Sequence, residues 1–174
     1  MITRPDIEAD FLRLLDSNRA RLWRVCRAYA WSPEDADDLY QEILFQIWRA
    51  LPSLRERAHE NTWLYRVALN TAISFVRKDK VQRNFIPSAN RELVELADRR
   101  AGQTEAHKDN PRLDKLYEAL AKLDRAEKGV MTLYLEDLPY AEIAEVMGMS
   151  PNHVGVLLHR TKKKLFNFMQ EAAV

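Results

Sequence analysis

Apolar residues recur every three or four positions along most of the chain, which is the spacing of a helix with one buried stripe. The first stripe follows Phe11 and consists of Leu12, Leu15, Leu22, Val25, Cys26 and Tyr29. A second consists of Ala36, Leu39, Tyr40, Ile43, Leu44, Ile47, Trp48 and Leu51, and a third of Leu64, Val67, Ala68, Thr71 and Phe75. The pattern therefore predicts three amphipathic helices in the first half of the chain.

Start and stop signals bound the second of these helices. Ser32 is a preferred N-cap residue, Pro33 suits the first helical position, and Asp35 stands where a capping box places its acidic partner. Pro52 ends the helix, because proline lacks the amide that the next hydrogen bond needs. The third helix is predicted to begin near Thr62, after a polar stretch.

The middle of the chain lacks this periodicity. From Arg83 to Pro111 it is polar, and its apolar side chains gather only at Leu93, Val94 and Leu96. We interpret this segment as an interdomain linker, with or without one short helix. The predicted organisation is a first domain over residues 1–82, a linker over residues 83–111 and a second domain over residues 112–174.

The second domain carries the signature of a helix-turn-helix. A short helix is predicted from Tyr140 to Met147, with Gly148 as its left-handed stop. Ser150 and Pro151 then open the last helix. Two preceding helices are indicated by a leucine stripe and a capping box, formed by Leu113, Leu116, Leu120, Leu123, Asp124 and Glu127. Two helices joined by a glycine-containing turn form a helix-turn-helix.

Composition supports a helical fold. The 174 residues include only four Gly and seven Pro, and 47% are hydrophobic. We therefore predict an all-α protein of two small helical domains joined by a polar linker, the second of which contains the helix-turn-helix. The formal net charge is only +1, so any nucleic-acid partner must be inferred from local charge.

Three features indicate a cytoplasmic protein. Cys26, the only cysteine, has no intrachain disulfide partner and falls on a helical stripe as a small hydrophobe. The first residues lack the pattern of a signal peptide. Charges interrupt every apolar run before the roughly 18 residues that a membrane span requires, so no membrane insertion is expected.

The sequence contains no pattern of a conventional active site. It has no nucleophile elbow, no phosphate loop and no metal-binding spacing. His153 and His159 are six positions apart, so they point to different faces of the last helix. We therefore predict no catalytic residue, metal site, cofactor or small-molecule substrate, and a binding protein rather than an enzyme.

The second helix presents an acidic face. Asp35, Asp38 and Glu42 lie on it, and no cation occurs between Ser32 and Ile47. Such a face suits a basic protein partner. The alternative is that the helix macrodipole alone favours carboxylates near the N-terminus.

Aromatic and basic residues alternate along the third helix. Trp63, Tyr65 and Phe75 are interleaved with Arg66, Arg77, Lys78, Lys80 and Arg83. Rings that stack on bases, beside cations that hold phosphates, are typical of a single-strand binding surface. The alternative is that the rings are core and the charges solvate a helix end. We expect this for Phe75, and both interpretations stay open for Trp63 and Asn70.

Basic and polar residues follow the turn of the helix-turn-helix. They are Asn152, His153, Arg160, Lys162, Lys163 and Lys164. The second helix of such a motif commonly enters the major groove of DNA. The alternative, a solvated C-terminal helix with cations favoured by the dipole, explains the lysines but not the turn.

Three segments together form a recognisable set. They are Asp35-Ala-Asp-Asp-Leu-Tyr-Gln-Glu42 with Trp48, Thr62-Trp-Leu-Tyr-Arg-Val-Ala-Leu-Asn-Thr-Ala72, and Tyr140-Ala-Glu-Ile-Ala-Glu-Val-Met-Gly148 followed by Val154, Leu158, His159 and Arg160. The set resembles the bacterial RNA polymerase sigma factors of the sigma-70 family, in their compact extracytoplasmic-function (ECF) group. In order, the segments are similar to the family's core-polymerase-binding helix, its minus-10 recognition helix and its minus-35 helix-turn-helix.

The resemblance implies partners and contact residues. It implies that core RNA polymerase is bound by Asp35, Asp38, Gln41 and Glu42. It assigns to the melted minus-10 element of promoter DNA the residues Arg55, Arg57, Trp63, Tyr65, Arg66, Asn70, Arg77 and Lys78. It assigns to the minus-35 duplex the residues Asn152, His153, Val156, His159, Arg160 and Lys163. An anti-sigma factor is a further implied partner.

The chain departs from the family pattern at two places. The loop that often contains Phe-Arg-Gly-Glu-Ser has Glu56 in place of its glycine and Glu60 in place of a hydrophobic residue. In the last helix, Gly155, Val156 and Leu157 replace residues that are often Lys, Ser and Arg. These replacements remove cations from the face that would meet the groove.

We therefore expect a sigma factor, which binds core polymerase and directs promoter-specific initiation. Two rival functions are a stand-alone helix-turn-helix repressor and a helical adaptor that sequesters a protein partner. A repressor needs neither the acidic face around Asp38 nor the aromatic segment at Trp63. These two features favour the sigma factor.

Overall fold

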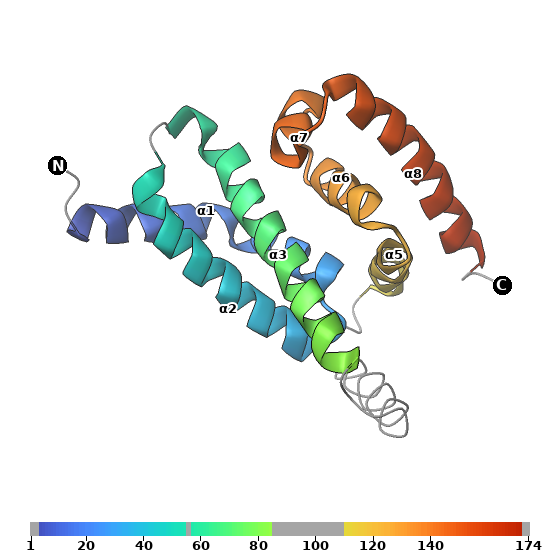
Figure 1. Cartoon of the computed structure of the whole chain (residues 1–174), viewed down its shortest axis with the longest axis horizontal. Helices are drawn as coiled ribbons and strands as arrows, with labels where there is room; N and C mark the ends of the chain where they lie inside the picture. Colours follow the sequence, from blue (N-terminus) through green and yellow to red (C-terminus); the bar gives the residue numbers. More distant parts are fainter. Residues whose placement is uncertain (1–3, 55–56, 85–109, 172–174) are drawn as a thin grey trace.

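All regular structure in the described residues is helical. The computed structural model describes residues 4–54, 57–84 and 110–171. Its helices are α1 (Arg4–Tyr29), α2 (Pro33–Ala50), α3 (Glu60–Asn84), α5 (Pro111–Ala121), α6 (Arg125–Leu135), α7 (Tyr140–Met147) and α8 (Pro151–Glu171), with 3₁₀ turns at Leu51–Ser53 and Arg57–His59 (Figure 1). The predicted all-α fold is confirmed, with α1 to α3 in the first helical domain and α5 to α8 in the second.

The three helices of the first domain share one core. Its largest fully buried side chains are Leu14, Leu22, Leu39, Ile43, Ile47, Leu64 and Tyr65. Two members of this domain's predicted stripes, Leu12 and Trp48, are instead exposed, as is Leu113 in the leucine stripe of the second domain. Leu12 lies roughly 110° and Trp48 roughly 135° around the helix from the centre of its buried residues, since successive residues are about 100° apart. The stripes are therefore narrower than the sequence pattern predicts.

Side-chain caps begin the helices where the sequence predicts them. The Ser32 hydroxyl accepts a hydrogen bond from the Asp35 amide (3.1 Å) at the start of α2. At the start of α6, the Asp124 carboxylate accepts from the Glu127 amide (2.9 Å), and the Glu127 carboxylate accepts from the Asp124 amide (3.2 Å). Both caps satisfy amides that have no partner within the helix.

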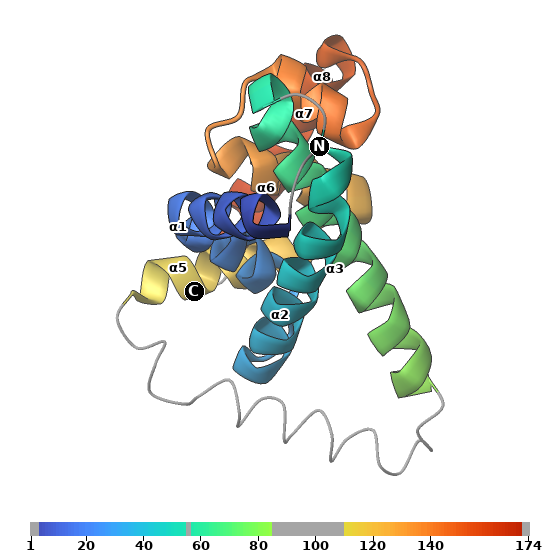
Figure 2. The same ribbon diagram turned by 90° about the vertical axis from the view of Figure 1, so that its left-hand side faces the viewer.

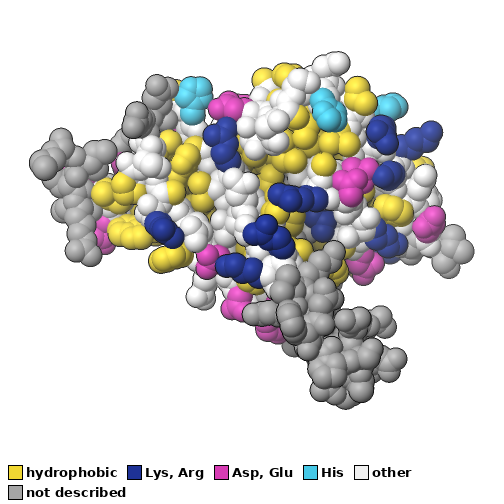
Figure 3. Space-filling view, in the orientation of Figure 1, with side chains coloured by type: hydrophobic (Ala, Val, Ile, Leu, Met, Phe, Trp, Pro, Cys, Tyr) yellow, Lys and Arg dark blue, Asp and Glu magenta, His cyan; other side chains and the backbone are white. Residues whose placement is uncertain are grey.

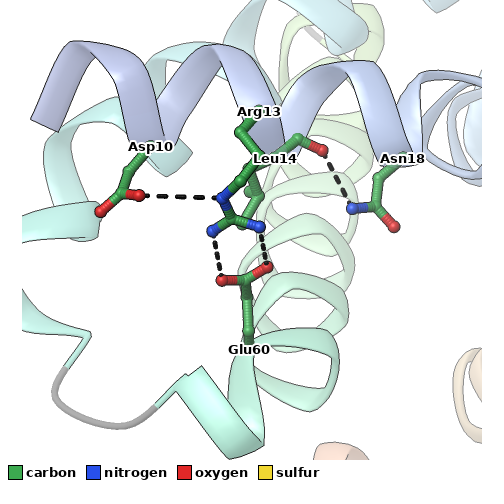
Figure 4. A network of polar contacts seen from close by, with 5 residues as sticks. All are labelled: Asp10, Arg13, Leu14, Asn18 and Glu60. Atoms are coloured by element: carbon green, nitrogen blue, oxygen red, sulfur yellow. Dashed lines mark hydrogen bonds and ion pairs between the residues drawn. The ribbon is translucent and has the colours of Figure 1, made fainter. Parts of the chain in front are cut away.

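A charged pair holds the start of α3 against α1. Arg13 donates from Nη1 and Nη2 to the two carboxylate oxygens of Glu60, at 3.0 and 2.7 Å (Figure 4). Asp10 lies 3.7 Å from Arg13 Nε, and the Asn18 side chain donates to the Leu14 carbonyl (2.9 Å). The hydrogen bond with Glu60 raises the pKa of Arg13. Glu60, which replaces a hydrophobic residue of the family pattern, therefore has a structural partner.

The turn between α7 and α8 is the predicted glycine turn. Gly148 adopts a φ of +67°, a conformation that costs glycine little and other residues more. Its amide and that of Met149 both donate to the Ala144 carbonyl. The Ser150 hydroxyl then accepts from the His153 amide (3.2 Å), which starts α8.

Helices extend into both ends of the segment interpreted as a linker. Helix α3 continues to Asn84, and α5 starts at Pro111 with Asn110 as its N-cap. The apolar patch at Leu93 to Leu96 lies outside the described residues. The domain boundaries given above stay a prediction.

The two domains lie against each other in a closed arrangement. Helix α3 runs beside α6 and α7, and α1 contacts α5 (Figures 1 and 2). Arg27 of α1 lies over the Tyr117 ring of α5 (4.3 Å to its centre) and is 3.2 Å from an Asp114 oxygen. Lys128 of α6 lies over the Tyr29 ring. The closed arrangement places the first helix of the helix-turn-helix on the predicted minus-10 helix.

Candidate functional surfaces

The acidic face of α2 is exposed over its middle. Asp38 and Gln41 are exposed, whereas Asp35 and Glu42 are partly buried. Gln46 donates to a Glu42 carboxylate oxygen at 2.8 Å, which holds that side chain along the helix. Asp38 and Gln41 are therefore the members of the predicted polymerase-binding set most accessible to a partner.

Aromatic side chains border this face, and the stripe pattern alone does not reveal them. Phe45 is 56% exposed and Trp48 is 36% exposed. The Trp48 ring meets Phe11 edge-on, with 5.1 Å between ring centres. Phe45 follows Glu42 by three positions, so the helical period places the two side chains on the same face. This spacing is the feature of the sequence that indicates an exposed Phe45. Exposed aromatic side chains within an acidic face are typical of a surface that binds another protein.

Most of the predicted minus-10 residues of α3 are at least partly accessible. The exposed ones are Arg66, Asn70, Arg77 and Lys78. Trp63 and Phe75 are partly buried against the core, which is the expectation for Phe75. Arg55 and the side chain of Arg57 lie outside the described residues. Figure 3 shows Lys and Arg side chains over α3 and over α8 on the same side of the molecule.

Tyr65 is the exception, because its side chain is fully buried. Its hydroxyl donates to Glu136 Oε2 at 3.3 Å, and Glu136 follows α6 in the second domain. Burial, together with this carboxylate, raises the pKa of Tyr65 above its ordinary value. The expectation that Tyr65 lies on a DNA-facing surface is therefore wrong for the closed arrangement, in which the side chain is buried and its hydroxyl is bonded to the second domain.

Helix α7 engages two more residues near the start of α3. Arg66 Nη2 donates to the Glu145 carbonyl at 3.0 Å and lies 3.6 Å from the Glu145 carboxylate. Asn61 Nδ2 is 3.5 Å from a Glu142 oxygen. Both contacts join the two domains. The closed arrangement therefore occupies part of the surface that the sequence assigns to the melted strand.

The outward face of α8 brings the predicted minus-35 residues together. The exposed side chains are Asn152, His153, Val156, His159, Arg160 and Lys163. Two neighbouring lysines instead contact other residues of the second domain. Lys162 lies 3.9 Å from the centre of the Tyr134 ring, and Lys164 is paired with the Glu127 carboxylate. From Asn152 to Lys163 the outward face is therefore polar and basic, with one exposed apolar side chain, Val156, within it, and the exposed Phe166 follows one turn further along α8.

Family models match both domains. Residues 14–81 match Sigma-70 region 2, and residues 113–165 match Sigma-70 region 4. The chain is 29% identical over 150 residues to RNA polymerase sigma factor SigV of Bacillus subtilis (strain 168), covering 86% of this chain and 84% of SigV. It is 30% identical over 141 residues to sigma factor YlaC of the same strain, covering 76% of each. The chain belongs to the sigma-70 family of RNA polymerase sigma factors.

The same comparisons support the ECF group. The sigma factor is 27% identical over 145 residues to the ECF RNA polymerase sigma-E factor of Escherichia coli (strain K12), covering 78% of this chain and 74% of that protein. Its fold is similar to the sigma factor RpoE from Bartonella quintana, solved in complex with the anti-sigma factor NepR. The TM-score is 0.70 and the identity 18%, over 95% of this chain and 97% of RpoE.

Every candidate surface of this sigma factor lies within a matched region. The acidic face and α3 up to Lys78 fall within the region 2 match, and the outward face of α8 falls within the region 4 match. Among the described residues, no helix is long and apolar enough to cross a membrane. Within the same residues, no group of three or more His, Cys, Asp or Glu side chains is placed to hold a metal ion.

Proposed function

We propose that this sigma factor docks on core RNA polymerase through the acidic face of α2 and carries promoter recognition on α3 and α8. One observation carries the proposal. The same chain presents an acidic surface with exposed Phe45 and Trp48 in its region 2 match, and a helix-turn-helix with an exposed basic face in its region 4 match. A repressor would need only the second of these surfaces.

Helix α8 is proposed to read the minus-35 duplex. Asn152 and His153 lie in its first turn, where recognition helices meet base edges. Arg160 and Lys163 lie further along and are proposed to contact phosphates, which position the helix without reading sequence. The tight Gly148 turn supports this role, because it fixes α8 relative to α7.

Helix α3 is proposed to hold the melted minus-10 strand. Unstacking a base costs a few kcal/mol, and stacking it on an aromatic ring returns about 1–3 kcal/mol. Melting therefore does not require this chain to hydrolyse a nucleotide. Trp63, Arg66 and Asn70 are the residues proposed for this contact. Because α7 binds Arg66 in the closed arrangement, we propose that the two domains separate when promoter DNA is bound.

The proposal includes further partners and a location. The sigma factor is proposed to catalyse nothing itself, to use no cofactor and to act in the cytoplasm on the polymerase. An anti-sigma factor is proposed as its inhibitor. The relation to RpoE, which was solved with NepR, supports this, as does the closed arrangement, since a protein that held the domains together would keep α7 on α3.

In vitro transcription with purified core RNA polymerase tests the proposal. Promoters are first selected from a random duplex library with the polymerase carrying this chain. We expect run-off transcripts from the selected promoters only when core polymerase and the sigma factor are both present. Specific DNA binding by the chain without polymerase, together with no transcript and no core binding, would instead support the repressor.

A further inference from the structure

The outward face of α8 contains a shallow hollow of about 450 Å³. It is lined by Tyr140, Pro151, Asn152, Gly155, Val156, His159 and Arg160. Tyr140 is the first residue of α7, so both helices of the helix-turn-helix contribute to the hollow. The sequence patterns do not single out Tyr140 as a contact residue, because it stands on the helix that does not enter the groove.

The Tyr140 ring lies beside Gly155 at the surface of α8. A Cβ atom at position 155 would lie 3.5 Å from Tyr140 Cε2 and 3.8 Å from Cδ2. The ring therefore lies over the part of α8 that has no side chain, and Val156 is the next residue along. Tyr140 is 42% exposed and Val156 is 53% exposed. An aromatic ring and a branched aliphatic group thus border one hollow.

The polar groups around the hollow define what it can accept. Asn152, His159 and Arg160 surround the two apolar side chains with hydrogen-bonding groups. The edges of base pairs in the major groove are also polar, and they present one apolar group, the 5-methyl of thymine. A protein surface that is polar and basic with one apolar spot matches that edge. The basic character of the face favours DNA over an apolar protein partner.

We infer that Val156 and Tyr140 form an apolar contact for the 5-methyl group of a thymine in the minus-35 duplex. The inference rests on the proposed binding of α8 in the major groove. It assigns a specificity role to Tyr140, which lies on α7 with its ring beside Gly155. Base reading then combines hydrogen bonds from the first turn of α8 with one methyl contact.

Replacing single thymines by deoxyuridine tests the inference, because this removes the methyl group and keeps every hydrogen-bonding group. The duplex is the minus-35 element selected with the complete holoenzyme. We expect one thymine position at which deoxyuridine weakens binding of the wild-type holoenzyme to the duplex by roughly fourfold. This is the change in affinity that corresponds to burying one methyl group. Val156→Ala should show a smaller difference between the two duplexes at that position, and Val156→Ala combined with Tyr140→Leu should bind both equally. Lys163→Ala is the matched control, which should weaken both duplexes alike and keep the fourfold difference.

A photochemical experiment gives an independent readout. 5-Iododeoxyuridine carries iodine in place of the methyl group and cross-links to nearby aromatic side chains when irradiated. At the sensitive position, mass spectrometry should find the cross-link on Tyr140. Tyr140→Leu should lose it, while circular dichroism confirms that this variant is folded.

The outcomes separate this inference from the proposed function. If no thymine position responds to deoxyuridine while Lys163→Ala still weakens binding at low salt, α8 binds DNA and the methyl contact is wrong. If neither Lys163→Ala nor Asn152→Ala changes DNA binding, the proposed role of α8 is wrong. Weaker binding of Val156→Ala to core polymerase, with unchanged binding to both duplexes, would show that the hollow receives a protein side chain and would overturn the inference.

Discussion

Arg24 of α1 and Glu136 of the second domain are joined by two hydrogen bonds across 112 positions of the chain. Arg24 Nε lies 2.6 Å from Glu136 Oε1, and Nη2 lies 2.7 Å from Oε2. Only 3% of the Glu136 side chain is exposed, and the Tyr65 hydroxyl donates to the same carboxylate. The hydrogen bond with Glu136 raises the pKa of Arg24. The nearly buried carboxylate thus takes these three hydrogen bonds from side chains of the other domain.

Arg24→Ala is expected to favour the open arrangement. Breaking a buried ion pair from one side costs about 3–5 kcal/mol, and because Arg24 is itself half exposed we expect a smaller effect, about 1–2 kcal/mol. Small-angle X-ray scattering should therefore show a larger radius of gyration for the variant than for the wild type. Arg13→Ala is the matched control, because the Arg13 and Glu60 pair has the same two-bond geometry within one domain.

The same variants test whether opening precedes DNA binding. If the closed arrangement competes with promoter DNA, Arg24→Ala should accelerate open-complex formation, and Arg13→Ala should not. An unchanged radius of gyration in Arg24→Ala would show that the domains are held by their apolar contacts instead. A larger radius with slower promoter opening would contradict the proposed competition.

The acidic face of α2 is expected to be required for core binding. Asp38→Arg combined with Glu42→Arg should weaken binding to core RNA polymerase at least about tenfold, because like charges placed opposite each other cost several kcal/mol. Fluorescence anisotropy of labelled sigma factor measures the affinity. Glu8→Arg combined with Asp16→Arg on α1 changes the net charge equally at two exposed positions and should bind almost as tightly as the wild type. Equal losses in both variants would mean that net charge, and not this face, controls docking.

Asn70→Ala is expected to impair promoter melting more than closed-promoter binding. The side chain is exposed on α3, and it is proposed to contact the melted strand. Permanganate footprinting should show less reactive thymine in the minus-10 element, by about threefold to tenfold if one hydrogen bond of about 1 kcal/mol is lost. Asn167→Ala, at an exposed position of α8, is the control. Unchanged thymine reactivity in Asn70→Ala would show that Asn70 is a solvated surface residue that does not contact the melted strand.

Helix limits are predictable from the sequence where one side chain sets them. Ser32, Asp124 and Gly148 each act through hydrogen bonds that span only a few residues. Their effect can therefore be predicted from the neighbouring residues alone. The edges of the buried stripes are less predictable. Leu12 and Phe45 are both apolar and both exposed. A small change in the angle at which a side chain leaves the helix decides whether it contacts the neighbouring helix.

The contact between the domains is not predictable from periodicity. Tyr65 and Glu136 are 71 positions apart, and nothing in the local pattern around either residue indicates the other. The resemblance assigns Tyr65 to the minus-10 contact, and the helical pattern gives no sign that the second domain meets it. Its burial depends on how two separately patterned domains meet, which is information that a helical stripe does not contain. The individual surfaces on α2 and α8, in contrast, follow from residues within a few turns of one another.

Cys26 is expected to resist thiol reagents in the folded protein. Its side chain is fully buried, and burial raises the pKa of the thiol to about 12. The thiolate is the reactive form, so iodoacetamide labelling at pH 8 should be slower than in urea by on the order of a hundredfold, measured by mass spectrometry. Rapid labelling in native buffer would contradict the buried position.

The raised pKa of the Cys26 thiol should also make the free energy of unfolding depend on pH. An unfolded cysteine titrates near pH 8.5, so the folded chain holds this proton more tightly. The Cys26 contribution to the free energy of unfolding is therefore complete below about pH 8.5 and is lost as the pH rises toward 12, by up to about 1.4 kcal/mol per pH unit. Urea denaturation of the wild type and Cys26→Ala at pH 8 and pH 9.5 should show a smaller loss in the variant. Equal losses would assign the effect to other groups.

Two glycines of the helix-turn-helix are expected to respond to alanine in opposite directions. Gly148 has a φ of +67°, so Gly148→Ala should lower stability by about 1–2 kcal/mol through backbone strain. Gly155 lies inside α8, where alanine is favoured by about 1 kcal/mol, and its new Cβ would make only an ordinary contact with Tyr140 at 3.5 Å. Thermal denaturation should therefore show a lower Tm for Gly148→Ala and a higher Tm for Gly155→Ala, by about 2–4 °C per kcal/mol. A lower Tm for Gly155→Ala would mean that the Tyr140 ring cannot adjust. A higher Tm combined with a lost preference for thymine would show that this glycine serves DNA recognition at the expense of helix stability.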